Sequence, residues 1–358
     1  MTIATKTDLG RDAWAIDDDV VRLREWGTDR CYLLPTAPDA TVTIGSSNTC
    51  SLPLTDPSGH LSRQHARLDR EAGRWLARDL DSKNGMRLDG VRKTKVLLEP
   101  GSELGLGGLT LVAESTRLIA LRSFLARILG WASHRSETVD LALRSVRLAA
   151  TQRAALALCG DGDLVPIARG LHRYAMGEDR PFVLCDPRRR DTEPSAARHS
   201  HGSGMQAFRA AAGGSMCLGT KRLPRDFAEV MTALRDPSTR VQLIVYGLRP
   251  PDRKELVSAP IEVPSLSSRD DEIDRVIDEY AGDAATTLRV PANLSRVLRD
   301  WVRTHSAASL PEIEKGTLRI LALREAGNVA RAAAMLGMAH ASLGEWIGRR
   351  RLPHGVLK

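Results

Sequence analysis

A glycine-rich segment, Gly160 to His172 with the sequence GDGDLVPIARGLH, has the residue types of a loop that could bind an anion. Backbone amides around glycines, followed by the start of a helix, hold phosphate in many nucleotide-binding proteins. Binding and hydrolysis of ATP also require a Lys on the terminal phosphates and a Ser or Thr hydroxyl on Mg²⁺. The segment contains none of these three residue types. We therefore expect the shape of a phosphate loop without the chemistry of an ATPase.

Strand-like and helical segments alternate around this loop and must position it. Four apolar runs, AALALCG, PFVLCD, GSMCLG and RVQLIVYG, alternate with helical stretches. This alternation is typical of a parallel sheet covered by helices. After the segment IEVPSL, apolar residues recur at helical spacing to the end of the sequence.

The order of these segments resembles the AAA+ domain of NtrC-type activators, which act with the alternative sigma factor. At the place of the family's Asp-Glu pair this sequence has Gly219 and Thr220, and Pro311 stands where a nucleotide-sensing Arg is expected. The family's sigma-contacting loop is also absent. The resemblance implies a degenerate AAA+ α/β subdomain over residues 117–262 and a helical lid-like subdomain over 263–312. These departures from the family pattern, together with the missing Lys and hydroxyl of the glycine-rich loop, predict no bound cofactor and no enzymatic activity.

The N-terminal third has a different pattern, with short alternating runs separated by turn residues. TVTIG, HARLDR, RWLARDL and LTLVA have the composition of strands, and SKNG, DG and EPGSEL supply turns. Many short strands at this spacing predict a β-sandwich. We assign the sandwich to residues 28–116, after an N-terminal extension of residues 1–27.

Three blocks of this region resemble the forkhead-associated (FHA) domain: IGSS, LSRQHARL and DSKNGMRLDG. The resemblance implies that the loops at one end of the sandwich bind a phosphothreonine-containing protein, such as a substrate of a Ser/Thr kinase. It implies that Ser62 donates a hydrogen bond to the phosphate and that Asn84 holds the peptide backbone. By the same resemblance, His65 braces the loops and Gly85 permits the tight turn.

One position departs from the FHA pattern. Ser46 stands where the family has its phosphate-binding Arg, and a hydroxyl cannot replace the charge of a guanidinium. Arg63 and Lys83 lie in the same expected loops and could supply the cation. At this point two interpretations stay open, a domain that binds phosphothreonine and a sandwich kept for protein contacts alone.

The segment GTLRILALREAGNVARAAAMLGMAHASLGEWIGRR resembles the Fis-type helix-turn-helix that ends the same activators. Asn328 suits a helix N-cap, Gly337 suits the turn between helices, and Leu343 suits a small core. We assign residues 313–358 to this DNA-binding domain. Fis-type domains act as dimers on two-fold sites, so we expect a homodimer.

Positive charge is concentrated in this last region. Residues 313–358 carry eight Lys or Arg against three Glu, a net charge of +5, and the whole chain has +8. Such charge favours binding to the phosphate backbone of double-stranded DNA. The expected base-facing residues are His340, Ser342, Glu345 and Trp346, and the expected backbone contacts are Arg349, Arg350 and Arg351.

Composition sets the remaining limits. A chain of 358 residues with 42% hydrophobic and 27% charged residues is long enough for several globular domains. Its five cysteines have no metal-ligand spacing, so we expect reduced thiols and no metal site. The sequence shows no signal peptide and no run of about 18 apolar residues. We expect a cytoplasmic protein with no membrane partner.

These features favour a bacterial transcription regulator with an FHA domain, an inactive AAA+-like connector and a DNA-binding C-terminus. Two alternatives stay open. The first is an ATP-dependent enhancer-binding activator, and the second is a phosphoprotein scaffold with no DNA target.

Overall fold

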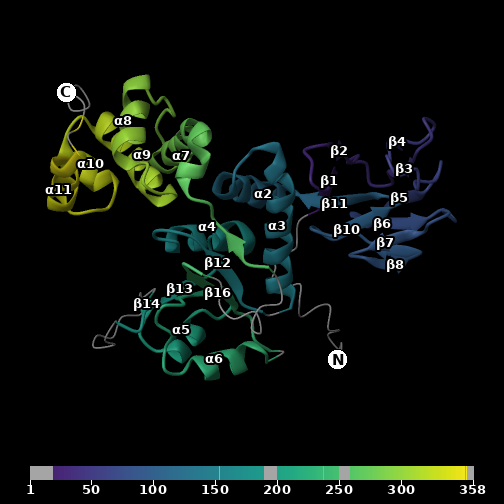
Figure 1. The fold of residues 1–358 in the computed structure, drawn as a ribbon, viewed down its shortest axis with the longest axis horizontal. Coiled ribbons are helices and arrows are strands. Elements are labelled where there is room, and N and C mark those ends of the chain that lie inside the picture. Colours follow the sequence, from purple (N-terminus) through teal and green to yellow (C-terminus); the bar gives the residue numbers. More distant parts are fainter. Residues whose placement is uncertain are drawn as a thin grey trace. The chain divides into compact units, whose positions relative to one another are not determined.

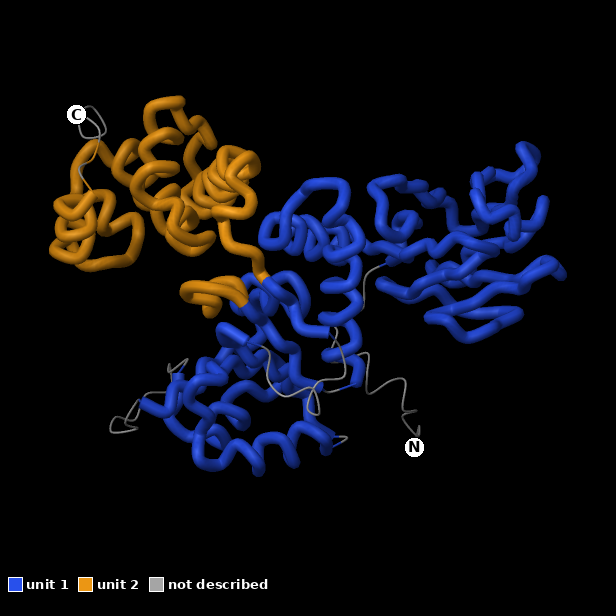
Figure 2. The backbone as a smooth tube through the Cα atoms, in the orientation of Figure 1, with its two compact units in different colours: residues 1–159, 168–262 blue, residues 160–167, 263–358 orange. Residues whose placement is uncertain are grey.

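The computed structural model describes residues 19–152, 154–188, 200–236, 238–249, 259–350 and 352. The chain divides into two compact units (Figure 2). The first comprises Met1–Cys159 with Ala168–Glu262, and the second comprises Gly160–Ile167 with Val263–Lys358. The expected sandwich and α/β regions therefore share the first unit, and the expected lid-like and C-terminal regions share the second.

The expected β-sandwich is confirmed at the N-terminal side of the first unit (Figure 1). One sheet has the strand order β2-β1-β11-β10-β7-β8 and the other has β4-β3-β5-β6-β9. Buried apolar residues of both sheets, among them Leu23, Leu68 and Met86, belong to one core cluster. The strands are β1 (Val20–Glu25), β2 (Cys31–Leu33), β3 (Thr41–Gly45), β4 (Leu52–Pro53), β5 (Ala66–Glu71), β6 (Arg74–Asp79), β7 (Met86–Leu88), β8 (Val91–Lys93), β9 (Lys95–Leu97), β10 (Glu103–Leu106) and β11 (Leu109–Ser115).

Two strands lie where the sequence predicted other structure. β1 lies inside the expected extension of residues 1–27, and it belongs to the sandwich because it pairs antiparallel with β11. Its sequence, VVRLRE, is rich in charge, and Arg24 is nevertheless fully buried because it contacts Glu114 at 2.7 Å. β10 covers the end of the expected turn EPGSEL, because it pairs with both β11 and β7.

Two helices follow the sandwich, α2 (Thr116–Leu129) and, after the short 3₁₀ helix η1 (Ser133–Arg135), α3 (Ser136–Thr151). α3 is attached to the sandwich by ion pairs. Asp140 contacts Arg24 at 2.6 Å with both side chains fully buried, and Arg144 contacts Glu103 at 2.5 Å. The sandwich and α3 are therefore joined by ion pairs, and solvent does not reach the one that Asp140 forms.

The expected parallel α/β sheet is also confirmed. Its strand order is β14-β13-β15-β16-β12-β17, and every neighbouring pair is parallel. α4 covers one face, and α5 and α6 pack on the other (Figure 1). The elements are β12 (Leu156–Cys159), α4 (Val165–Met176), β13 (Phe182–Cys185), β14 (Ser200–His201), α5 (Gly204–Ala210), β15 (Ser215–Gly219), α6 (Phe227–Leu234), β16 (Gln242–Gly247) and β17 (Ile261–Glu262).

The second unit is helical after Val263. Its helices are η3 (Leu266–Glu272), α7 (Ile273–Leu288), α8 (Arg296–Ser306), α9 (Leu310–Ala326), α10 (Val329–Met335) and α11 (His340–Arg350). α9 packs against α7, α8 and α10, and it runs without interruption through the expected boundary between residues 312 and 313. The expected lid-like and C-terminal regions thus share one helix.

Candidate functional site

The loops that join β3 to β4 and β4 to β5 meet at one end of the sandwich. A Cβ atom at Gly45 would lie 2.2 Å from the carbonyl oxygen of Arg63, so only glycine fits there. The next residue, Ser46, donates its backbone N–H to the Ser62 carbonyl at 3.0 Å, and Ser47 donates to the Arg63 carbonyl at 3.0 Å. The backbone of the exposed Ser46 is therefore fixed directly beside Ser62.

Ser62 also joins the loop between β6 and β7. Its hydroxyl oxygen accepts a hydrogen bond from the backbone N–H of Lys83 at 3.0 Å. Within the described residues this hydroxyl donates no hydrogen bond, so its proton can go to an outside acceptor. The residue expected to bind phosphate therefore lies, half-buried, where three loops meet.

His65 is the brace that the sequence predicted. It is fully buried, its Nδ1 accepts from the backbone N–H of Ser62 at 3.1 Å, and its Nε2 lies 3.2 Å from the Gly85 carbonyl. Because Nδ1 accepts, Nε2 carries the proton and donates it to that carbonyl. The imidazole thus ties the β4–β5 loop to the β6–β7 loop.

Asn84 and Gly85 form the turn at the end of the β6–β7 loop. The Asn84 side-chain amide donates to the His60 carbonyl at 2.8 Å, which leaves its other N–H and its carbonyl oxygen for a ligand. Gly85 has a φ of +69°, in the left-handed region that glycine tolerates. The side chain of Arg92 lies over this glycine, since a Cβ there would be 2.6 Å from the Arg92 Nε.

Two features of this site were missed from the sequence. Arg92, which lies on β8, adds a third exposed cation to the expected Arg63 and Lys83. Asp56 accepts hydrogen bonds from Ser58, from the His60 N–H and from the Gly108 N–H, and so fixes the loop that precedes Ser62. Burial disfavours the charged form of Asp56, yet these hydrogen bonds hold its pKa well below the usual range. The sequence motif D-x-S-x-H could have indicated this turn.

In the glycine-rich segment from Gly160 to His172, an acidic side chain lies at the start of α4. The carboxylate of Asp163 accepts the backbone N–H of Val165 at 3.2 Å, so an anion of the protein already occupies the start of α4. Lys315 lies 3.9 Å from that same carboxylate. A phosphate at this helix start would meet a fixed negative charge, which opposes nucleotide binding.

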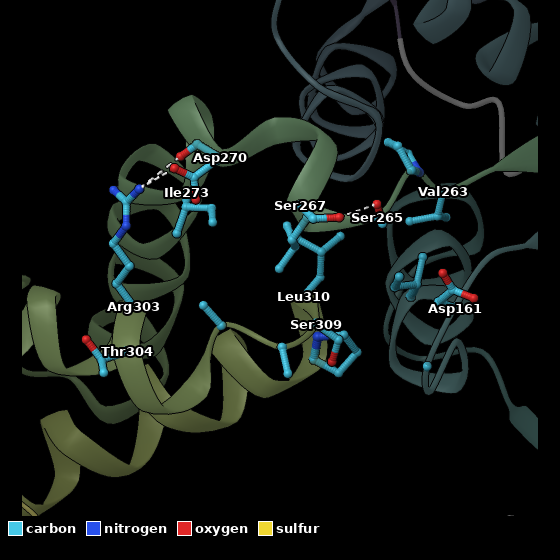
Figure 3. A pocket seen from close by; sticks show the side chains of 17 residues that line it. Asp161, Val263, Ser265, Ser267, Asp270, Ile273, Arg303, Thr304, Ser309 and Leu310 are labelled. Atoms are coloured by element: carbon cyan, nitrogen blue, oxygen red, sulfur yellow. Dashed lines mark hydrogen bonds and ion pairs between the residues drawn. The ribbon is translucent and has the colours of Figure 1, made fainter.

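A pocket of about 610 Å³ lies beside this segment within the second unit (Figure 3). Its wall includes Asp161 and Pro311, and Arg303 is the one cation among the described residues that line it. Arg303 is already engaged, at 2.8 Å from Asp270 and 3.1 Å from Asp274. The pocket therefore offers no uncommitted cation for a phosphate group.

Gly219 and Thr220, which stand at the place of the family's acidic pair, lie at the end of β15. Gly219 ends β15, and the ring of Tyr246 lies over it, 3.2 Å from where a Cβ would be. The neighbouring Thr220 donates its backbone N–H to the Tyr246 carbonyl at 2.8 Å. No group of three or more potential metal ligands occurs in the described part of the chain.

The expected DNA-contacting residues of α11 fall into three groups. His340, Ser342, Glu345 and Arg349 are exposed, and Arg349 contacts Glu345 at 2.8 Å. Arg351 lies outside the described residues.

The prediction for Trp346 is wrong. Its side chain is buried and meets Trp301 edge to face, with the ring centroids 5.7 Å apart, so it cannot face a base. Arg350 is also committed, because it lies over the Trp346 ring and contacts Glu312 at 2.7 Å. The sequence could not show this, since Trp301 and Glu312 lie on other helices.

The described loops at one end of the sandwich thus hold Ser62, His65, Asn84 and Gly85 together. Residues 42–107 match the FHA domain family, so this part of the chain is an FHA domain. No curated protein matches the sequence.

Solved structures similar to about a quarter of the chain include FHA domains. One belongs to a study of phosphothreonine-dependent FHA interactions, with 23% identity over 26% of this chain and 93% of that chain, at a TM-score of 0.24. Another is an FHA domain from Chlamydia trachomatis, with 25% identity over 25% of this chain and 92% of that one, at a TM-score of 0.23. A third is Mycobacterium tuberculosis EmbR bound to a low-affinity phosphopeptide, with 23% identity over 27% and 24% of the two chains and a TM-score of 0.24.

Among the described residues, no helix combines the length and apolarity needed to cross a membrane.

Proposed function

We propose that the FHA domain binds a phosphothreonine on a protein partner. The observation that carries this proposal is the position of the Ser62 hydroxyl, which is held by the Lys83 N–H where three loops meet and keeps its own proton for an acceptor. The Asn84 side chain, in the same group of loops, retains donor and acceptor capacity for a peptide backbone. Arg63 and Lys83, in the same loops, supply the positive charge that Ser46 lacks.

Titration of the full chain with synthetic phosphothreonine peptides tests this proposal. A hydrogen bond to a charged group contributes about 1.5–3 kcal/mol, so Ser62→Ala is expected to weaken binding about tenfold or more. Ser123→Ala, on the exposed face of α2, is the matched control and should bind like the wild type. Equal affinity for phosphorylated and unphosphorylated peptides would show instead a sandwich used for protein contacts alone.

We propose further that the C-terminal helices bind double-stranded DNA, as the resemblance to a Fis-type helix-turn-helix implies. Three local features support this. Asn328 caps α10 by accepting the Arg331 N–H at 2.9 Å, Gly337 has a φ of +61° at the turn, and Leu343 of α11 is fully buried. His340, Ser342, Glu345 and Arg349 remain the contact candidates on the exposed face of α11.

The complete proposal is a cytoplasmic transcription regulator that acts as a homodimer and catalyses no reaction. Its parallel α/β sheet, with Asp163 at the start of α4, serves as a connector of degenerate AAA+ type. Titration of the full chain with ATP and Mg²⁺ separates this from the alternative of an ATP-dependent activator. Saturable binding would favour the activator.

DNA binding is tested by selecting duplexes from random sequence with the full chain and then measuring affinity against salt. Arg349→Gln is expected to reduce the slope of log affinity against log salt by about 1. Arg296→Gln on α8 is the matched control, since both arginines are exposed and paired with an acid four residues away. If no duplex is recovered, the chain is better explained as a phosphoprotein scaffold.

A further inference from the structure

A strip of exposed residues, 91–95, runs along the sandwich from β8 in one sheet to β9 in the other. It contains three cations, Arg92, Lys93 and Lys95, which we name the basic edge. All three are exposed, and within the described residues their side chains form no hydrogen bond and no ion pair. The basic edge therefore presents positive charge that the protein itself does not neutralise.

Several other cations of the sandwich are neutralised by the fold. Arg67 and Arg78 both contact Asp69, at 2.6 and 3.2 Å, and Arg78 also contacts Glu71 at 2.6 Å. On the opposite sheet, Arg22 contacts Glu114 at 2.7 Å. Arg74 on β6 and Arg87 on β7 are exposed and also form no side-chain hydrogen bond or ion pair within the described residues, so the basic edge is distinguished by holding three such cations between Arg92 and Lys95.

Two contacts place the basic edge beside the proposed phosphothreonine site. The backbone N–H of Asp79, where the β6–β7 loop begins, donates to the Thr94 carbonyl at 2.9 Å. At the other end of that loop, the guanidinium of Arg92 lies over Gly85, directly after Asn84. A peptide held by Asn84 therefore passes within the range of these cations, because exposed charges interact over about 8–10 Å at moderate salt.

The same loops contain little opposing charge. Asp81 is exposed in the β6–β7 loop, and it is the one acid between Leu80 and Gly85. Arg63 and Lys83 flank Ser62 and can balance a phosphate dianion. The basic edge is then additional to what the phosphate needs, and its charges repel one another until a ligand neutralises them.

We infer that the partner of the FHA domain carries acidic residues beside its phosphothreonine, and that the basic edge contacts them. This inference rests on the proposed phosphothreonine binding and specifies the class of peptide that is bound. Exposed ion pairs contribute about 0.2–1 kcal/mol each, so three of them discriminate between peptides without dominating affinity.

Two synthetic phosphothreonine peptides of equal length, one with Glu and one with Gln at the flanking positions, test the inference by titration of the full chain. We expect the Glu peptide to bind about tenfold more tightly at low salt, from the pair energies above. The triple variant Arg92→Gln, Lys93→Gln, Lys95→Gln should lose that preference and bind the two peptides with about equal affinity. The single variant Arg92→Gln should weaken the preference, and its matched control is Arg74→Gln, which should keep it. Arg74 is exposed at the end of β6 that lies away from the β6–β7 loop.

The outcomes separate the two proposals. If both peptides bind with equal affinity, or if the triple variant keeps the preference, the inference is overturned while phosphothreonine binding stands. If neither phosphopeptide binds the wild type, both proposals fail. Displacement of the Glu peptide by duplex DNA in the wild type, together with loss of DNA affinity in the triple variant, would instead make the basic edge a nucleic-acid surface.

Discussion

At the scale of single residues, the site depends on positions where the backbone dictates the residue type. Gly45, His65 and Gly85 were predictable because each belongs to a short motif whose residues interact locally. Arg92 was not predictable, since its position over Gly85 results from the pairing of β7 with β8. The burial of Trp346 depends in the same way on a partner from another helix, Trp301.

Gly45→Ala is expected to destabilise the FHA domain. The added Cβ would meet the Arg63 carbonyl at 2.2 Å, and a backbone atom cannot move aside as a side chain can. Forcing extra atoms into such a contact costs about 1–3 kcal/mol. Urea unfolding followed by tryptophan fluorescence measures the cost. The control is Gly282→Ala on α7, where an added Cβ would meet nothing within 4 Å. A Gly45→Ala variant as stable as wild type would contradict the prediction.

His172 should make the α/β region sensitive to acid. It is buried, its Nδ1 accepts from the Ser215 hydroxyl at 2.8 Å, and its Nε2 donates to the Arg180 carbonyl at 3.0 Å. Burial lowers the pKa of His172 below its ordinary value, against the opposing effect of the bond to Arg180. The unfolded chain then binds more protons in acid, so this stability is complete above about pH 6.5 and is lost as the pH falls below it.

Unfolding free energies measured from about pH 8 to pH 5 test this dependence. His172→Gln should flatten the slope, while His340→Gln, at an exposed position, should leave it unchanged. A slope that is the same in wild type and His172→Gln would assign the acid sensitivity to other groups.

At the scale of elements, the sequence predicted which segments form helices and strands better than it predicted which of these elements pair with one another. The apolar runs of the parallel sheet were found because strands buried on both faces are apolar throughout. β1 was missed because its buried charges resemble a surface segment, and only its pairing with β11 explains them. The start of α9 had a readable signal, since Ser309 caps it by accepting the Glu312 N–H and a proline follows.

The helical stability of α11 is lowered by two glycines in its interior. Gly344 and Gly348 lie inside it, and a Cβ at either position would meet nothing within 4 Å. Gly344→Ala and Gly348→Ala are each expected to raise stability by up to about 1 kcal/mol, because alanine loses less backbone entropy in a helix. Thermal unfolding of the second unit measures the gain. A loss of DNA affinity in these stabilised variants would indicate that the bare backbone approaches the duplex closely.

At the scale of the whole molecule, the sequence indicated five regions and the structure divides into two compact units. The sandwich and the α/β sheet share one unit because α2 and α3 connect them, and α3 contacts the sandwich through Asp140 and Arg144. Contacts of this kind join residues more than a hundred positions apart, such as Arg24 and Asp140, and no local pattern reveals them.

Asp140→Ala should loosen the sandwich from the rest of its unit. The change leaves Arg24 buried without one of its two carboxylate partners, and breaking a buried pair costs about 3–5 kcal/mol. We expect earlier unfolding and faster proteolysis between the sandwich and α3. Asp29→Ala is the control, because Asp29 pairs with Arg122 while largely exposed. Equal proteolysis of both variants would show that the ion pairs of Arg144 with Glu103 and of Arg147 with Asp89 hold the connection without Asp140.

The continuity of α9 has a consequence for how genes of this kind can recombine. New combinations of domains arise most readily when the crossover falls in a linker, because both halves then fold as before. A crossover at residue 313 would instead cut α9 within its first turn and separate it from α7 and α8, against which it packs. A hybrid that inherits α10 and α11 must therefore inherit the chain from Val263 onward, so the C-terminal helices and the helices before them evolve as one heritable piece.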